Sequence, residues 1–386
     1  MKFKVTSNAN KSYDLFIILD DLTAEGCPIL ALNLIDEFKK KNLKILLLRF
    51  RENNNELLKE FKKRKIEIFS YKLKDYGLFR YLKIINLTFK LSNKFKPSSI
   101  LCFPLGWHSF VAIGAKLAGI KNVCTHVGNL ALDVNNINFW KFKLLINLGY
   151  PFTNKFICCS KYVKNSLIKN LNLNLKSSKI QMIYNCYNNE KFKFKKKNLL
   201  NEKINNHEEI IIAMVGRFEI HKDQETLIKA ISLLKEQGIK VKLLLIGDGS
   251  KLQILKKLVD NLNLINEILF LGALNEVDKI LETVDIFVLS TTKYEGFGIA
   301  IAEAMGKGIP IIASDIGCCR EILLDGKCGT LVKANSDISL ANGVMIILKN
   351  IKVTEAKRQK AYSHCLKNFN KEKMSMEYIK KLEITH

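Results

Sequence analysis

The segment EGFGIAIAE, residues 295–303, begins and ends with a glutamate. The hydrophobic run before it, residues 286–289, predicts a buried strand, and the apolar residues after it keep a helical spacing as far as Met305. Glu295 is therefore expected in a loop between a strand and a helix, and Glu303 inside that helix. The alternative is that Glu295 is solvated in the loop and that Glu303 forms ordinary hydrogen bonds on the helix, without a ligand.

Two glycines, Gly296 and Gly298, lie between this strand and the helix. Because they lack side chains, backbone N–H groups at the helix N-terminus can approach a ligand closely, and the helix dipole favours an anion there. Carboxylates beside an anion site suit a ligand that carries both hydroxyls and phosphates. A nucleotide sugar is such a ligand.

Strand-like apolar runs alternate with helix-length segments, such as residues 28–41 and 226–236, and this alternation predicts mostly parallel sheets with both faces covered. The expected strands are residues 14–20, 44–50, 66–71, 100–104, 122–128, 155–160, 179–185, 210–215, 241–246, 268–271, 286–289 and 310–314. Ligands of such sheets bind outside the carboxyl ends of the strands.

A charged, Asn-rich stretch at residues 189–207 interrupts the alternation and is interpreted as a basic linker. We therefore predict an α/β protein of two doubly wound, Rossmann-like domains that face each other across a cleft. The first domain is expected at residues 1–188 and the second at residues 208–370. Residues 371–386 are expected to form a helix that packs back on the first domain.

The composition excludes several classes of protein. A hydrophobic content of 48% argues against global disorder. No apolar run approaches the ~18 residues that span a bilayer, and residues 1–14 lack a signal-peptide pattern, so a cytoplasmic location is expected. The ten cysteines form no CxxC pair, so no metal site is expected. Cys318 and Cys319 lie near the proposed site, and a redox role for them is the minor alternative.

The formal net charge of +25 is concentrated in the first half of the chain. Residues 1–188 hold 31 Lys and Arg against 12 Asp and Glu, whereas residues 208–386 hold 25 against 23. A coding bias toward lysine would act on both halves alike. The asymmetry therefore favours an anionic partner for the first half.

A second set of candidate residues follows the first strand of the second half, in the segment GRFEIHKD, residues 216–223. Arg217 offers a planar fork of donors that matches phosphate oxygens, and Lys222 adds a mobile positive charge. Both are expected to project from the carboxyl end of the strand. The alternative is two solvated cations in a loop. The GDG turn at residues 247–249 opens a further helix, although such a turn alone is weak evidence.

Together these segments resemble the retaining glycosyltransferases of family 4, also called glycosyltransferase group 1, which have the GT-B fold. The ordered motifs are GRFEIHKD, LLLIGDGS, LFLGALN, VDIFVLST and EGFGIAIAEAMGKGIPIIASDIGCCREIL. Before the linker, MIYNCYNNEKF resembles the hinge segment of the family, with Cys186 where the family usually has glycine. The resemblance is strong over residues 179–335 and covers the first half only in outline.

The resemblance implies roles for matching residues of the second domain. Arg217 and Lys222 would bind the donor diphosphate and stabilise the charge of the departing nucleotide. Glu295 would contact the donor sugar near the reacting carbon, and Glu303 would bind the ribose hydroxyls. The other residues expected to bind the donor through the backbone or beside the nucleobase are Gly216, Gly272, Ala273, Gly296, Phe297, Gly298 and Ile299.

In the first domain the resemblance implies two further residues. Gly26 corresponds to the glycine loop of the family near the phosphates, and His126 to its active-site histidine. The alternatives are a His126 satisfied by local hydrogen bonds and a competing histidine, His108, after another strand.

The activity implied is transfer of a sugar, with retention of configuration, from a nucleotide sugar, UDP- or GDP-linked, to a hydroxyl of a glycan or lipid-linked acceptor. The leaving phosphate would take the acceptor proton, so no metal or other cofactor is expected. Biosynthesis of cell-surface polysaccharide or lipopolysaccharide is the expected setting. The alternatives are a nucleotide-sugar epimerase of the same architecture, a non-catalytic subunit and a basic nucleic-acid-binding protein. Because no nucleic-acid-binding module is recognised, nucleic acid is not an expected partner.

Two segments mix large apolar side chains with lysines, residues 78–96 and residues 138–152. Each is either an interfacial helix or an ordinary helix packed on the sheet with solvated lysines. The hypothesis is that the first domain binds an anionic membrane surface, which would make the protein peripheral on the inner face of the plasma membrane.

Overall fold

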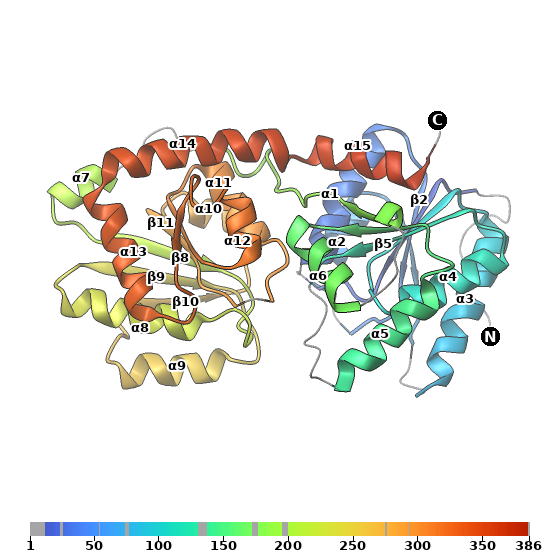
Figure 1. Ribbon diagram of the computed structural model, residues 1–386, viewed down its shortest axis with the longest axis horizontal. Coiled ribbons are helices and arrows are strands. Elements are labelled where there is room, and N and C mark those ends of the chain that lie inside the picture. Colours follow the sequence, from blue (N-terminus) through green and yellow to red (C-terminus); the bar gives the residue numbers. More distant parts are fainter. Residues whose placement is uncertain are drawn as a thin grey trace. The chain divides into compact units, whose positions relative to one another are not determined.

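The computed structural model describes residues 12–23, 26–53, 55–73, 77–129, 137–171, 177–194, 200–274, 276–292 and 294–384. The chain forms two compact units (Figure 1). Unit 1 consists of Met1–Asn185 with Lys371–His386, and unit 2 of Cys186–Asn370. Each unit is an α/β domain with its own parallel sheet, as the alternating pattern predicted.

In the described part of unit 1, seven parallel strands take the order β3-β2-β1-β4-β5-β6-β7. The strands are β1 (Leu15–Leu19), β2 (Ile45–Arg49), β3 (Glu67–Ser70), β4 (Ser99–Cys102), β5 (Asn122–Val127), β6 (Lys155–Cys158) and β7 (Ile180–Met182). The helices are α1 (Gly26–Lys40), α2 (Leu58–Lys63), α3 (Phe79–Phe95), α4 (His108–Leu117), α5 (Ile137–Gly149), α6 (Lys161–Leu171) and α15 (Lys371–Leu382). The order reverses between β1 and β4, which is where ligands bind in such sheets.

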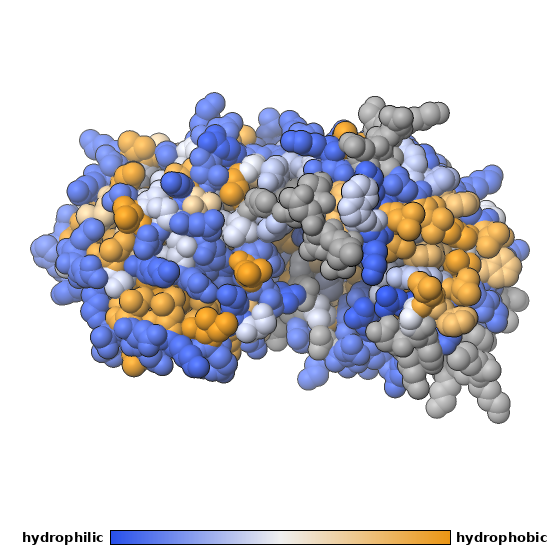
Figure 2. Space-filling view, turned by 60° about the horizontal axis from the view of Figure 1, so that its bottom comes forward, coloured by the Kyte–Doolittle hydropathy of each residue, from blue (hydrophilic) through white to orange (hydrophobic). Residues whose placement is uncertain are grey.

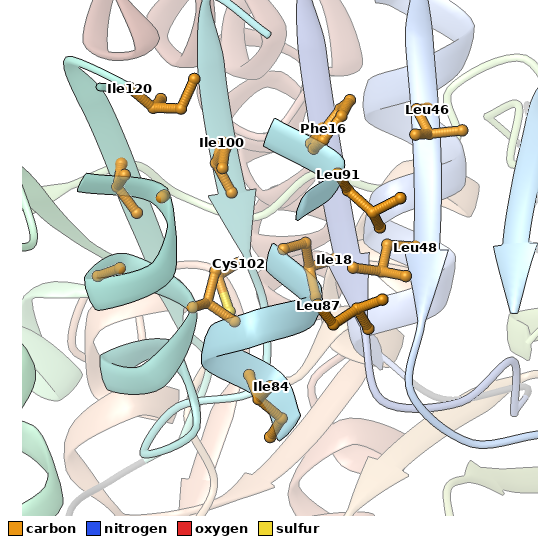
Figure 3. Packing of buried hydrophobic residues seen from close by; sticks show 14 of the residues in the cluster. Phe16, Ile18, Leu46, Leu48, Ile84, Leu87, Leu91, Ile100, Cys102 and Ile120 are labelled. Carbon is orange, nitrogen blue, oxygen red and sulfur yellow. The ribbon is translucent and has the colours of Figure 1, made fainter. Parts of the chain in front are cut away.

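The core of unit 1 lies where α3 and α4 cover the central strands. Figure 3 shows Phe16 and Ile18 of β1 beside Leu87 and Leu91 of α3, and all four are buried. The strands are apolar on both faces because helices cover both, so they are continuous hydrophobic runs in the sequence. This is why the strand positions in unit 1 could be predicted to within two residues, except that the strand expected at residues 179–185 already ends at Met182.

The described part of unit 2 holds six parallel strands in the order β10-β9-β8-β11-β12-β13. They are β8 (Ile210–Val215), β9 (Val241–Ile246), β10 (Ile268–Gly272), β11 (Ile286–Leu289), β12 (Ile311–Ser314) and β13 (Thr330–Val332). The helices are α7 (Leu200–Asn205), α8 (Gln224–Glu236), α9 (Leu252–Asn261), α10 (Val277–Leu281), α11 (Ile299–Lys307), α12 (Gly317–Ile322), α13 (Asp337–Lys349) and α14 (Ile351–Asn368). Here the order reverses between β8 and β11.

Three elements differ from or refine the sequence-based expectations. The edge strand β13, which has three residues, was not predicted. Part of the stretch expected as a linker lies in unit 2, where it forms α7 and buries Leu200. The C-terminal helix α15 lies in unit 1, where its Leu382 carbonyl accepts hydrogen bonds from Ser99 and Asn122. Within the described residues, no helix is long and apolar enough to cross a membrane.

Candidate active site

The point where the strand order of unit 2 reverses brings two of the predicted segments together. Residues 216–223 follow β8, and residues 290–298 follow β11, the neighbouring strand. The His221 carbonyl accepts hydrogen bonds from the backbone N–H of Thr292 at 3.0 Å and from the Thr291 hydroxyl at 2.8 Å. The two loops are therefore tied into one surface at the carboxyl edge of the sheet, the usual place for a ligand.

Lys222 and Glu295, which are 73 positions apart in the chain, form an ion pair on this surface. The Lys222 side chain is 16% exposed and that of Glu295 is 11% exposed. Burial would raise the pKa of Glu295, but the Lys222 ammonium and the backbone N–H of Gly298 hold it below its usual value. Glu295 is therefore ionised at neutral pH, with one oxygen on Lys222 and the other on Gly298 at 3.1 Å.

Arg217 lies beside this pair and is oriented by an acidic neighbour. Its Nη2 donates to Glu219 at 2.8 Å, and its side chain is half exposed. Glu219 also accepts from the Ser250 hydroxyl at 2.8 Å, and hydrogen bonds from Ser250 and Arg217 lower its pKa. The guanidinium is thus held at the edge of the site with surface left for a phosphate.

The glycines of the GDG turn allow this arrangement because the turn packs on the backbone that carries Arg217. Gly247 has φ +143°, and a Cβ there would lie 2.1 Å from the Gly216 carbonyl. Gly249 has φ +158°, and a Cβ there would lie 2.6 Å from the Phe218 carbonyl. Any side chain at either position would displace the Arg217 loop.

The helix α11 begins at this surface. Gly298 is its N-cap with φ +74°, a left-handed conformation that disfavours other residues. Phe297 is buried and its ring packs edge-on against Phe369, so it anchors the loop in the core. The backbone of Gly296, Phe297 and Ile299 lies at the N-terminus of α11, where N–H groups and the helix dipole favour an anion.

Glu303 lies on α11, and no described residue forms a hydrogen bond with its carboxyl. Burial raises its pKa to about 8, Asp278 raises it further, and Lys191 opposes the shift. The side chain is partly exposed, and a desolvated carboxyl without a hydrogen-bond partner is costly for a folded protein. Hydroxyl groups of a ligand would satisfy it.

The residues expected beside a nucleobase lie at the carboxyl end of β10. Gly272 has φ +70° with open space around its α-carbon, and Ala273 is exposed. The Gly272 carbonyl accepts from the backbone N–H of Gly247 at 2.8 Å, so this segment is joined to the GDG turn. The structure therefore brings the predicted residues of unit 2 to one edge of its sheet.

In unit 1, His126 lies on β5 and Gly26 begins α1. The His126 ring is buried, and its Nδ1 is 2.8 Å from the hydroxyl of Tyr378 on α15. Burial lowers its pKa to about 3, so the ring is neutral. A Cβ on Gly128 would lie 3.0 Å from His126 Nε2 and 3.6 Å from the Sγ of Cys27, which follows Gly26. The two residues expected in unit 1 therefore lie close together.

The competing His108 has a different environment. Its Nδ1 accepts from the Gly106 N–H at 3.0 Å, its ring packs edge-on against Phe156, and its Nε2 is buried without a partner. Burial lowers its pKa to about 3 as well. Its contacts are those of a core residue at the start of α4.

Tyr378 was not predicted as a site residue. Its signal in the sequence is only that of an apolar position on a C-terminal helix, and its partner is 252 positions away. This hydrogen bond between the Tyr378 hydroxyl and Nδ1 holds the imidazole ring in one orientation.

We expect Tyr378→Phe to lower kcat about tenfold, because the His126 ring loses the hydrogen-bond partner that orients it. The donor KM should change little, and steady-state kinetics would measure both. In a His126→Ala background the same substitution should have no further effect. An equal loss in both backgrounds would show that Tyr378 acts through folding.

Comparisons with known proteins identify the family of the chain. The family model of glycosyl transferases group 1 matches residues 195–364. An uncharacterized glycosyltransferase of Methanocaldococcus jannaschii is 31% identical over 282 residues, which cover 71% of this chain and 71% of the relative. The chain belongs to the glycosyl transferases group 1 family. It is therefore a glycosyltransferase, as the ordered motifs indicated.

Two other relatives match, and one of them has a named activity. A 4-alpha-N-acetylgalactosaminyltransferase of Campylobacter jejuni, which acts on a diphospho-undecaprenol-linked sugar, is 28% identical over 78% of this chain and 82% of its own. A second M. jannaschii glycosyltransferase is 29% identical, and that match spans 63% of its length.

Solved structures share the fold. HepE of Anabaena, crystallised with UDP and glucose, superposes with a TM-score of 0.82 at 17% identity over 97% of this chain and all of that one. A Rickettsia africae glycosyltransferase gives 0.79 at 20% identity over 97% and 99%. At such identities the likeness establishes the GT-B fold, which confirms the predicted fold class.

Proposed function

We propose that this glycosyltransferase transfers a sugar from a nucleotide sugar to a hydroxyl of a glycan or lipid-linked acceptor, with retention of configuration and without a metal. The observation that carries the proposal is the Lys222–Glu295 pair beside the N-terminus of α11, at the point where the strand order of unit 2 reverses. It provides an anchored carboxylate and an anion site within one surface.

The cations and the helix end would bind the donor diphosphate. In the reaction a bond forms between the acceptor oxygen and the anomeric carbon, and the bond from that carbon to the phosphate oxygen breaks. Arg217, Lys222 and the N–H groups at the start of α11 would stabilise the negative charge that develops on the leaving diphosphate. The acceptor proton would pass to that diphosphate, and Glu295 would contact the donor sugar.

The unpartnered carboxyl of Glu303 suits the two ribose hydroxyls of the donor nucleotide. Gly272 and Ala273 would border the base. A uridine nucleotide is our first choice, with guanosine as the second, because HepE was crystallised with UDP. In unit 1, Gly26 and His126 would approach the phosphates and the donor sugar.

The acceptor would be anionic or embedded in an anionic surface, because the first half of the chain carries most of the positive charge. The Campylobacter relative acts on a sugar that is linked to a lipid diphosphate. We place the reaction in the cytoplasm or at the inner face of the plasma membrane, in the synthesis of a cell-surface polysaccharide or lipopolysaccharide.

A thermal-shift screen against UDP-, GDP-, ADP- and dTDP-sugars would test the donor. One nucleotide should raise the Tm of the wild type by mass action, and it should fail to do so for Arg217→Ala. Lys256→Ala, which removes an exposed lysine from α9, is the matched control and should keep the shift. The absence of a shift with every nucleotide sugar, in a folded sample, would overturn the proposal.

A further inference from the structure

Two helices of unit 1 carry apolar side chains on the side that faces solvent. On α5, Trp140, Leu144 and Leu148 follow one another at intervals of four and are 62%, 69% and 46% exposed. At the start of α3, Phe79 and Leu82 are 70% and 62% exposed. A helix that only covers a sheet has polar residues on its outer face, so these stripes require another explanation.

The stripes lie on neighbouring helices, with α4 packed against both. The Tyr81 ring of α3 stacks on Phe110 of α4, with centroids 4.2 Å apart. On the other side, the Ser109 hydroxyl of α4 donates to the Leu145 carbonyl of α5. Figure 2 shows a hydrophobic area on the surface of unit 1, at the right of the view. We call the exposed apolar residues Leu78, Phe79, Leu82, Trp140, Leu144 and Leu148 the α3–α5 face.

Lysines accompany the apolar residues of this face, and the part of the chain that contains it is basic. Residues 76–189 contain 15 Lys and Arg but a single acidic residue, Asp133. Lys141 is exposed on α5, and the Lys143 ammonium lies 5.3 Å from the centre of the Trp140 ring. An apolar centre with an indole ring and a cationic border matches the boundary between lipid headgroups and acyl chains.

The position of the face agrees with access to a lipid-linked substrate. In a parallel sheet with crossover helices, each helix begins near the carboxyl edge of the sheet. Phe79 and Trp140 lie in the first turns of α3 and α5, and Gly26 begins α1. The apolar stripes therefore start at the same edge of unit 1 as the residues expected to meet the substrates.

We propose that the α3–α5 face binds an anionic lipid surface, so that the enzyme takes its acceptor directly from the membrane. The proposal rests on the lipid-linked acceptor of the proposed function. A second copy of the chain is a poorer occupant, because a symmetric contact through this face would place the same lysines against one another. An anionic membrane complements both the charge and the apolar centre.

Sedimentation with vesicles tests the proposal with the full-length chain. The vesicles contain phosphatidylcholine alone, or phosphatidylcholine and phosphatidylglycerol in equal parts. The test variant is Trp140→Ser with Leu144→Ser, and the matched control is Ile254→Ser with Ile265→Ser, two exposed apolar residues of unit 2. We expect the wild type and the control to bind the anionic vesicles, and the test variant to bind about tenfold more weakly.

Three results would overturn the proposal. The first is that the wild type stays in the supernatant of anionic vesicles at low salt. The second is that the test variant binds as well as the wild type. The third is a concentration-dependent dimer that the test variant cannot form, without vesicle binding. The thermal shift with nucleotide sugar is measured on the same samples, so a failure of the donor site is recognised separately.

Discussion

Replacement of Lys222 by alanine is expected to lower kcat/KM by about a thousandfold, because an active-site donor aimed at developing charge contributes on this scale. The methylene chain of Lys222 passes beside Gly216, and its ammonium forms an ion pair with Glu295 in the loop before α11. It can therefore hold the carboxylate and meet the leaving diphosphate from one position. Steady-state kinetics with the donor found in the thermal-shift screen would measure the loss.

A double-mutant cycle separates these two roles of Lys222. If the lysine only positions the carboxylate, Lys222→Ala will cost nothing further in a Glu295→Gln background. We expect an additional loss in that background, because the charge on the leaving group still needs stabilisation. Lys222→Arg should retain part of the activity, and Lys229→Ala, which removes an exposed lysine of α8, should retain all of it. Activity of Lys222→Ala within a fewfold of the wild type would contradict the assignment.

The folding of Lys222→Ala has to be followed beside its activity. Glu295 is largely buried, so removal of its cation leaves an uncompensated carboxylate, which destabilises a protein by about 3–5 kcal/mol in buried pairs. Both side chains of this pair retain some solvent contact, which reduces that cost. The Glu295→Gln substitution removes the charge, so the double variant should recover Tm even though its activity stays low.

The sequence was sufficient to place the strands because a sheet covered on both faces requires continuous apolar runs. It was also sufficient to name the residues at the point where the strand order of unit 2 reverses, because each follows such a run. The contacts between these residues could not be predicted from the sequence. The pairing of Lys222 with Glu295 depends on β8 and β11 being neighbours in the sheet, and no local pattern encodes that neighbourhood.

Two features of the chain could not be predicted from the overall composition of the segments that contain them. The charged stretch before β8 was interpreted as a linker, although Phe192 and Leu200 within it are buried in unit 2. Likewise, Tyr378 is one apolar position on a lysine-rich helix. Its hydroxyl forms the hydrogen bond with His126 only because α15 packs against β5. Periodicity and composition do not predict contacts between single side chains that are far apart in the chain.

Replacement of Glu303 by glutamine is expected to weaken donor binding by about tenfold to a hundredfold, the range of a hydrogen bond to a charged group. It should also remove a pH dependence that the wild type shows. The pKa of Glu303 is about 8 without ligand. Hydroxyls that donate to the carboxylate favour its ionised form, so binding near pH 7 should release a proton. Affinity in the wild type should then rise from pH 6 to pH 8.

Calorimetry in two buffers with different ionisation enthalpies would measure this proton release. The observed heats should differ between the buffers for the wild type and agree for Glu303→Gln. Glu321→Gln, at a partly exposed position of α12, is the matched control and should behave as the wild type does. Equal affinities of the wild type at pH 6 and pH 8 would contradict the proposed contact between Glu303 and the ribose.

The same raised pKa has a consequence for the protein without ligand. The unfolded chain releases the Glu303 proton near pH 4.3, about the usual value for glutamate, whereas the folded chain keeps it to about pH 8. The folded state therefore loses stability as the pH rises through this interval. Glutamine cannot ionise, so Glu303→Gln should melt above the wild type at pH 7.5, and the difference in Tm should shrink as the pH falls toward 5. A carboxyl that lowers the stability of the protein without ligand, and whose cost the donor removes on binding, is what a site selected for ligand binding would retain.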